Sequence, residues 1–584
     1  MSVDLEIKKA KSSAKKGDIG TAIQTLINIL ETYPSNKRIL ESFNRLKKVA
    51  DSLGRVNPSD QEIEGLILAF KAGDFKKLSD KIFYTLKVYP KSTFLWNLLG
   101  VTLGRLGDDT GALSSYRQTL KINPDHVEAN YNLGTALRRM GDFDGSQDAL
   151  EKALSLQPNH INAHFNLAHV LLDKGEDYQA IFNLEKILSL NPRHFDAKHL
   201  LANTLRFVGR LEDALQTYVE LTSMKPDYAP AFNDMGNTLR DQHKLSEALL
   251  SYDRAIQIDA AYPDPHFNKS LVYLQSFSFQ KGFDLYKWRL ELNYGDTPNW
   301  TRTLPLWAGE KNAKVVIWAE QGIGDEVMFA GIVPHALERN PNITLQCDRR
   351  LINIYANSFP KNLTLISRDD KLDLEKFDMQ IAIGGLASIF RSSLESFTKH
   401  PQTYLKADQQ KTIKIRDSLA DGNTERIVGV SWQTSSKTAH KKNIPLEQLA
   451  KKIHSKNSKI VSLQYGDVTK QLDQLEKDFG IKIEQLNEID KFNDLEGLFA
   501  LICSCDEVIT VDNATAQFGG ALGVSTSVLL PFSCEWNWGL ENQSCVWYDS
   551  VRLYRQSRPG DWDSALQALG DDKRKASLNA DNLV

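Results

Sequence analysis

The sequence lacks the features that would mark a membrane, secreted or nucleic-acid-binding protein. No stretch approaches the roughly 18 apolar residues that a membrane-spanning helix needs, and the N-terminal segment MSVDLEIKKAKSSAKKGD has no apolar run of the signal-peptide kind. Charge of one sign is not in excess, because 71 basic and 74 acidic residues leave a formal net charge of -3 and no global basic field. We therefore expect a cytoplasmic protein that does not bind nucleic acid.

Cysteine is also scarce. The five cysteines are an odd number and all lie beyond residue 340, which favours reduced thiols over a disulfide framework. Cys503 and Cys505 are separated by one residue in an apolar run, and no nearby pair of histidines would complete a zinc site. We expect buried structural thiols and no bound metal.

What the chain does have is length and an ordinary globular composition. Hydrophobic residues make up 41% of it and charged residues 25%, which is typical of a folded, soluble protein. Its 584 residues exceed what one hydrophobic core supports, so we expect about three to four folding units.

The first half carries an internal repeat of 34 residues, the tetratricopeptide period. In each period a glycine ends the first helix, a small alanine allows close helix approach, and a proline stops the second helix. The recurring prolines are Pro90, Pro124, Pro158, Pro192 and Pro226, the glycines are Gly107, Gly141, Gly175 and Gly209, and the alanines are Ala112, Ala180, Ala214 and Ala248.

Degenerate copies extend this array in both directions. Gly17, Ala22 and Pro34 mark an earlier copy, and the stretch HFNKSLVYLQSFSFQKGFDLYKWRL marks a last one. We therefore expect an α-solenoid of about eight hairpins over residues 1–292, with an additional helix near 35–55 where the period breaks. Such a solenoid has a concave groove that binds an extended partner.

One position of the first helices is repeatedly an amide or a carboxylate. Side chains repeated along a groove can bind the backbone of a peptide whatever its sequence. The series resembles the asparagine ladder of O-linked N-acetylglucosamine transferase, in which tetratricopeptide repeats also precede a glycosyltransferase. The alternative is that these side chains support packing between repeats. The residues are Asn132, Asn166, Asp234 and Asn268.

After a linker over residues 293–311, short apolar runs alternate with helix-like segments, which predicts parallel sheets. The runs KVVIWA, NITLQC, LTLIS and FDMQIAI form one cluster within residues 312–408. The runs RIVGVSW, KIVSLQ, IKIEQL, DEVITVD and TSVLLPF form a second within 425–563, before a polar tail over 564–584. We expect two Rossmann-like halves with ligands outside the carboxyl ends of the strands.

Three loops after these strands carry candidate ligand-binding residues. In residues 320–326 two glycines let the backbone approach a ligand before a helix begins, although no third glycine or Gly-Lys-Ser/Thr follows. Residues 431–442 are rich in hydroxyls and cations, as suits phosphate, or form a solvated surface loop. In residues 508–530 a strand ends at Asp512 and a helix follows, whose free amides suit a diphosphate unless Asp512 only caps the helix.

Four segments of the second half resemble the heptosyltransferase-type glycosyltransferase family of GT-B architecture, and more closely its bacterial branch in which tetratricopeptide repeats come first. They are PLWAGEKNAKVVIWAEQGIGDEVMFAGIVPHAL, GVSWQTSSKTAHKKNIPLEQL, ITVDNATAQFGGALGVSTSVLLPF and WNWGLENQSCVWYDSVRLYRQSRPGDW. The similarity spans roughly residues 304–563 in order and without large gaps.

This resemblance implies an inverting, metal-independent transferase that needs no cofactor beyond its nucleotide-sugar. The family's catalytic base maps onto Asp325, unless that residue only caps its helix. A helix start would lower the pKa of Asp325 and weaken it as a base. The donor contacts map onto Gln321, Gly322, Gly324, Ser431, Ser435, Lys441, Gln464, Tyr465, Asp512, Asn513, Ala514, Thr515 and Gln517.

Family members commonly have histidine where this chain has Gln517. That departure keeps a second interpretation open, a non-catalytic repeat scaffold with a degenerate nucleotide-binding domain. A nucleotide-sugar-modifying enzyme is disfavoured because no Tyr-x-x-x-Lys pair accompanies a dinucleotide fingerprint. We expect a protein or peptide acceptor in the repeat groove, while the nucleotide and the sugar stay open.

Overall fold

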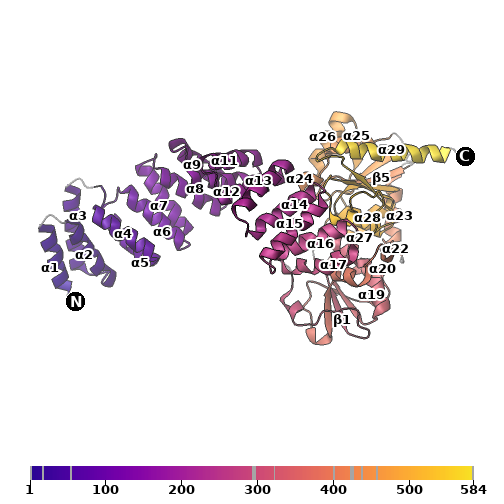
Figure 1. Cartoon of the computed structure of the whole chain (residues 1–584), viewed down its shortest axis with the longest axis horizontal. Helices are drawn as coiled ribbons and strands as arrows, with labels where there is room; N and C mark the ends of the chain where they lie inside the picture. The colour runs from indigo at the N-terminus through magenta and orange to yellow at the C-terminus, as the bar shows by residue number, and fades with distance from the viewer. Residues whose placement is uncertain are drawn as a thin grey trace. The chain divides into compact units, whose positions relative to one another are not determined.

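A computed structural model describes residues 3–581 except 16–18, 53–55, 293–296, 321, 399–401, 421–425, 436–438 and 456–457. The chain forms two compact units, Met1–Met224 and Lys225–Val584 (Figure 1). No helix in the described ranges is both long and apolar enough to cross a membrane.

The first unit consists of helical hairpins, as the 34-residue period predicts. The predicted additional helix is present as α3 (Lys37–Ser52). The hairpins are α1 (Val3–Lys15) with α2 (Ile19–Thr32), α4 (Asp60–Ala72) with α5 (Phe75–Leu86), α6 (Thr93–Arg105) with α7 (Asp109–Ile122), α8 (Val127–Arg139) with α9 (Phe143–Leu156), α10 (Ile161–Asp173) with α11 (Asp177–Leu190), and α12 (Phe195–Phe207) with α13 (Leu211–Met224).

A glycine in the left-handed backbone region closes the first helix of most hairpins. The φ angles of Gly107, Gly141, Gly175 and Gly209 lie between 76° and 83°, and Gly73 has the same conformation. Side chains with a Cβ are disfavoured there, so the repeated glycine sets the turn. Gly17 of the earliest copy lies outside the described residues.

The last two hairpins belong to the second unit. They are α14 (Ala229–Asp241) with α15 (Leu245–Ile258) and α16 (Pro263–Gln275) with α17 (Phe279–Tyr286), followed by the 3₁₀ helix η1 (Lys287–Glu291). The compact units divide at residue 224, inside the repeat array, whose predicted end at residue 292 directly follows η1. The physical reason is a shared core, because Phe279, Phe283 and Tyr286 are buried together with strand residues such as Ile317.

Two parallel sheets make up the rest of this unit (Figure 1). The first has the order β3-β2-β1-β4 and the second β10-β9-β8-β5-β6-β7. Every predicted apolar run contains a strand, whereas β10 was not predicted. The strands are β1 (Val315–Trp318), β2 (Ile343–Cys347), β3 (Thr364–Ser367), β4 (Met379–Ala382), β5 (Arg426–Ser431), β6 (Ser458–Ser462), β7 (Ile483–Glu484), β8 (Glu507–Val511), β9 (Thr526–Leu530) and β10 (Val551–Arg555).

Helices follow the strands as right-handed crossover connections require. Those around the first sheet include η2 (Asn299–Arg302), α18 (Ile323–Ala330), α19 (Val333–Arg339), η3 (Arg349–Leu351), α20 (Ile352–Ser358), η4 (Leu374–Lys376), η5 (Ile383–Gly385), α21 (Leu386–Phe390) and α22 (Glu395–Thr398). Those around the second are α23 (Gln409–Leu419), α24 (Ala439–Lys442), α25 (Leu446–Ile453), α26 (Thr469–Phe479), α27 (Leu495–Ser504), α28 (Ala514–Ala521) and η6 (Trp536–Trp538).

The predicted polar tail over residues 564–584 is helical in its described part and is anchored at its start. Residues 562–581 form the helix α29 (Trp562–Asp581). Trp562, Ala565, Leu566 and Leu569 recur at helical spacing and are buried in the core of the second sheet. The composition of the segment is polar, but this one stripe is enough to hold the helix against α25 and β10.

Candidate functional site

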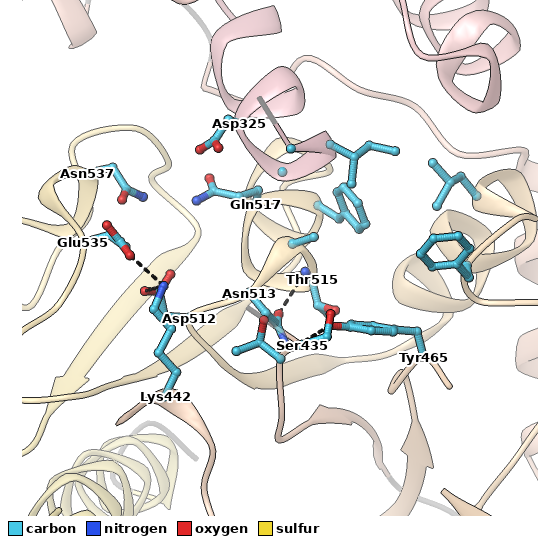
Figure 2. A pocket seen from close by; sticks show the side chains of 18 of the residues that line it. Asp325, Ser435, Lys442, Tyr465, Asp512, Asn513, Thr515, Gln517, Glu535 and Asn537 are labelled. Carbon is cyan, nitrogen blue, oxygen red and sulfur yellow. Dashed lines mark hydrogen bonds and ion pairs between the residues drawn. The ribbon is translucent and has the colours of Figure 1, made fainter. Parts of the chain in front are cut away.

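A cavity of about 730 Å³ opens in the second unit, beyond the carboxyl ends of β1, β5 and β8. Its wall combines the starts of α18 and α28 with the loop that contains η6 and with residues from α16 and α17 (Figure 2). Among the predicted site residues, those that line it are Gly322, Gly324, Asp325, Ser435, Tyr465, Asp512, Asn513, Ala514, Thr515 and Gln517. Gln321 lies outside the described residues.

Asp325 lies in the first turn of α18, on the cavity wall. The helix begins after Gly322 and has no side-chain cap, so Asp325 does not serve as its N-cap. Burial raises the pKa of the Asp325 carboxyl to about 7, and the carboxylates of Glu535 and Asp512 act in the same direction against the cation of Lys442. The pKa of Asp325 is thus raised by desolvation and like charges, whereas the helix start led us to expect a lowered one.

Gly324 brings the two helix starts together. A Cβ atom at this glycine would lie 3.3 Å from Ala514 Cα and 3.5 Å from Gln517 Cγ. α18 of the first half and α28 of the second half therefore pack directly against each other. This contact holds Asp325 above the N-terminus of α28, as Figure 2 shows.

An ion-pair network lies beside Asp325. Lys442 Nζ lies 2.9 Å from Asp512 Oδ2 and 2.8 Å from Glu535 Oε1. The opposite oxygen of Asp512 accepts a hydrogen bond of 2.8 Å from Trp538 Nε1. Asp512 therefore orients a cation rather than capping α28.

The lysine in this network is not the one that the family resemblance indicated. Lys442 lines the cavity, whereas Lys441 Nζ lies 3.7 Å from Asp241 Oδ2 of α14. Both belong to the short helix α24, where neighbouring side chains point about 100° apart. The candidate phosphate-binding cation is therefore Lys442.

Asn513 and its neighbours build the loop that presents α28. Asn513 Oδ1 accepts a hydrogen bond from the Thr515 amide at 3.0 Å, and Asn513 Nδ2 donates to Ser431 Oγ at 2.8 Å. Gln464 Oε1 in turn accepts hydrogen bonds from Ser431 Oγ and from the Trp432 amide at 3.1 and 3.0 Å. Ser431 and Gln464 are buried and do not line the cavity, so they support the loop from behind.

Ser435, Tyr465 and Gln517 are positioned by polar contacts. The Ser435 amide donates to the Tyr465 hydroxyl at 2.9 Å. The hydroxyl of Tyr548 donates to Gln517 Oε1 at 2.9 Å, and Figure 2 shows the Gln517 carboxamide next to Asp325. An uncharged carboxamide therefore lies beside the candidate base.

The cavity has a cationic and aromatic region that sequence reasoning missed. Arg350 and Arg368 both pair with Asp348, and the guanidinium of Arg350 lies over the Phe492 ring. Lys491 is only 9% exposed, and within the described residues its ammonium has no ion pair, only a hydrogen bond of 3.4 Å to the Leu486 carbonyl. Burial accordingly lowers the pKa of Lys491. The rule that ligands bind at strand ends could have found Arg350, which follows β2.

The amide series of the repeats makes contacts between neighbouring hairpins. Asn132 Nδ2 donates to Asn97 Oδ1 at 3.1 Å, and Asn166 Nδ2 donates to Thr135 Oγ1 at 2.8 Å. In the second unit Asn268 Nδ2 donates to Asn233 Oδ1 at 2.9 Å, whereas Asp234 accepts from Asn233, its neighbour in the same helix. These bonds support the packing alternative. Asn166 also lines a cavity of about 500 Å³ in the first unit, so peptide binding stays a prediction.

Parts of the chain are similar to known proteins. Protein FlbA of Caulobacter vibrioides is 26% identical over 319 residues, and the match covers 51% of this chain and 53% of that protein, about half its length. The solved structure of YrrB, described as a TPR protein with an unusual peptide-binding site, is 21% identical with a TM-score of 0.30 and covers 32% of this chain and 96% of that one. MamA is 24% identical with a TM-score of 0.27, covering 28% and 95%.

Models of repeat families match within the helical hairpins. Residues 95–126, 127–160 and 161–194 match the tetratricopeptide repeat, and residues 236–276 match the TPR repeat. The helical-hairpin part of the chain therefore consists of tetratricopeptide repeats.

Proposed function

We propose that this protein is a glycosyltransferase of GT-B type that moves a sugar from a nucleotide-sugar to a protein or peptide acceptor. The observation that carries the proposal is Asp325, a carboxyl with a pKa of about 7 on the wall of the cavity in which α28 begins. A general base works best when its pKa lies near the working pH. An aspartate exposed to water would instead have a pKa near its ordinary 3.8.

The proposed reaction is a direct displacement. Asp325 accepts the proton of an acceptor hydroxyl while that oxygen forms a bond to the anomeric carbon of the donor. The bond from the anomeric carbon to the phosphate oxygen breaks, and the nucleotide leaves with the electron pair. Attack from the side opposite the leaving group inverts the anomeric centre, and no bound metal is part of this proposal.

The donor is proposed to lie along the second half. The backbone amides at the start of α28 and the cation of Lys442 would meet the phosphates of the leaving group. Tyr465 and Phe492, whose ring centroids are 6.5 Å apart, offer aromatic faces to a nucleoside. Lys491 supports an anionic ligand, because its ammonium is largely buried and no ion pair of 4 Å or less is formed with it in the described part of the chain.

A second candidate is a repeat scaffold whose α/β part binds a nucleotide without turnover. Lys442 favours it, because this cation is already neutralised by Asp512 and Glu535 and is less free to stabilise a leaving group. The two candidates differ in the fate of the donor.

A screen of the full-length protein against nucleoside diphosphate-sugars and nucleoside monophosphate-sugars tests the proposal. Ligands that raise the melting temperature are then incubated with the protein, and released nucleotide is measured. Donor binding with slow nucleotide release supports the transferase. Donor binding without release, even with an acceptor, supports the scaffold, and absence of binding across both panels contradicts both candidates.

A further inference from the structure

The repeats depart from their own pattern at the last two turns. In the register of Gly73, Gly107, Gly141, Gly175 and Gly209, the next two positions are His243 and Phe277. Both keep the left-handed backbone, each with a φ of 59°. A histidine or phenylalanine is strained in that region, and such strain persists where the surrounding structure maintains it. Because glycine would be less strained at both turns, we looked for contacts that explain the histidine and the phenylalanine.

His243 contacts the loop that follows β9. Its ring stacks on Phe532 with centroids 4.2 Å apart and planes 11° from parallel. Its Nε2 atom donates to the carbonyl oxygen of the same Phe532 at 3.0 Å. Two residues before the turn, Asp241 accepts a hydrogen bond of 3.1 Å from Ser533 Oγ. The end of α14 thus holds the first residues of this loop through both side chains and backbone.

Phe277 holds the other end of the same loop. A Cβ atom at Gly539 would lie 2.6 Å from Phe277 Cζ, so the ring rests directly on the backbone of this glycine. Next to the turn, Gln275 Nε2 donates to the Cys534 carbonyl at 3.3 Å. The two turns that lack glycine therefore bracket residues 532–539, which we call the 532–539 loop.

The 532–539 loop carries part of the cavity wall. Glu535, Trp536 and Asn537 line the cavity, and Glu535 pairs with Lys442. Trp538 of the same loop donates to Asp512. Asp325, Glu535 and Asn537 lie on one side of the cavity in Figure 2.

We propose that His243 and Phe277 are positioning residues of the site, which fix the 532–539 loop so that Glu535 and Asn537 face Asp325. The last two repeats are then part of the catalytic machinery rather than part of the acceptor-binding array alone. The structural half of this inference stands on the contacts above, and only its effect on the reaction rests on the proposed function.

Loosening the loop has a predictable effect on Asp325. The charged groups that act on this carboxyl are Glu535, Asp512 and Glu320, which raise its pKa, and Lys442, which lowers it. If Glu535 moves away, the carboxylate that raises the pKa of Asp325 most is lost, and water can reach Asp325. The pKa of Asp325 should then fall from about 7 toward its ordinary value, and the pH profile of any turnover should move to lower pH with it.

The test replaces His243 and Phe277 singly by glycine in the full-length chain. Glycine fits the left-handed turn at least as well as the native residue, so the helices α14 and α16 should still end at the same place. His266→Ala is the matched control, because it removes a ring that stacks on Trp288 in the same repeat and does not touch the loop. Amide hydrogen exchange is measured across the chain, and nucleotide release is measured against pH.

We expect exchange in the 532–539 loop to rise at least tenfold in both glycine variants and not in the control, with β8 and β9 unchanged. His243→Phe, which keeps a ring but loses the donor, should fall between. Unchanged exchange in the loop, or a rise shared equally by β8 and β9, overturns the proposal. If the wild-type protein releases no nucleotide, the proposed function fails, and the exchange experiment still decides whether the two residues hold the loop.

Discussion

Arg289 and Glu320 form a bidentate ion pair in the interior of the second unit. Arg289 Nε donates to Glu320 Oε2 at 2.8 Å, and Nη2 contacts the other carboxylate oxygen. Both residues are 8% exposed. Glu320 also accepts a hydrogen bond of 3.0 Å from the Gly384 amide. The pair joins the end of the repeats to the loop that leads from β1 to Asp325.

Breaking this pair should destabilise the second unit strongly. Arg289→Met leaves a buried carboxylate without its cation, so we expect a loss of about 3–5 kcal/mol in the free energy of unfolding. The double variant Arg289→Met with Glu320→Met should lose less than the single one, because no buried charge is left unpaired. Urea unfolding followed by tryptophan fluorescence measures both. Equal losses would mean that the pair is not coupled.

The pH dependence of turnover should report Asp325. A base must be deprotonated to act, so kcat/KM should rise with pH up to about 7 and then level off. Burial also raises the pKa of the neighbouring Glu326 to about 7, so the two carboxyls titrate over the same range. The pH profile of Asp325→Asn separates the two carboxyls. Glu326 is present in both proteins, so a rise near pH 7 that is lost in the variant belongs to Asp325.

Stability gives an independent measure of the same carboxyl. The folded protein keeps the Asp325 proton up to about pH 7, whereas the unfolded chain loses it near 3.8, so the folded state becomes less favoured as pH rises between these values. Asp325→Asn removes this penalty. We expect the variant to be more stable than wild type at pH 8, by on the order of 4 kcal/mol, and nearly equal to it at pH 4. A variant less stable at pH 8 would contradict the raised pKa.

The two neighbouring lysines should differ in their effect on donor binding. Lys442→Met removes the cation between Asp512 and Glu535, and we expect donor affinity to weaken by about 2 kcal/mol or more. Lys441→Met is the matched control and should bind donor almost as wild type does, since Lys441 lies near Asp241. Titration calorimetry with the best donor from the screen measures both. A larger loss of donor affinity in Lys441→Met than in Lys442→Met would identify Lys441 as the donor-binding lysine.

The amide series allows peptide binding to be separated from packing. Asn132→Ala and Asn97→Ala both remove the hydrogen bond between these residues, and each should cost about 1 kcal/mol of stability. If Asn132 also binds the acceptor, only Asn132→Ala should raise the acceptor KM, and donor affinity should stay unchanged in both. Equal KM values for the two variants would leave packing as the role of Asn132.

Sequence periodicity was enough to predict the repeats and the sheets, because each depends on local patterns of apolar residues, glycine and proline. The expectation that ligands bind outside the carboxyl ends of parallel strands likewise placed Asp325, Ser435 and Thr515 at one cavity. It could not choose between Lys441 and Lys442, because the direction of a side chain on a four-residue helix depends on where that helix starts. Glu535 and Lys491 were missed because no motif marks them.

Contacts distant in sequence explain the remaining differences. Asp241 meets Ser533 and Gln275 meets Cys534 across more than 250 residues, and no local pattern encodes such pairs. These contacts help to make the last two repeats part of the second unit. Helix α29 was not predicted for a related reason. Its apolar stripe is short, and the stripe packs against β10, a strand that was not predicted either.

The most direct test of the account is Asp325→Asn, measured for both donor affinity and sugar transfer. Asparagine keeps the size of the side chain but cannot accept the acceptor proton. We expect the donor isotherm of the variant to match wild type and the transfer rate to fall by at least about 10²- to 10⁴-fold. Full transfer activity in Asp325→Asn would contradict the assignment of Asp325 as the base.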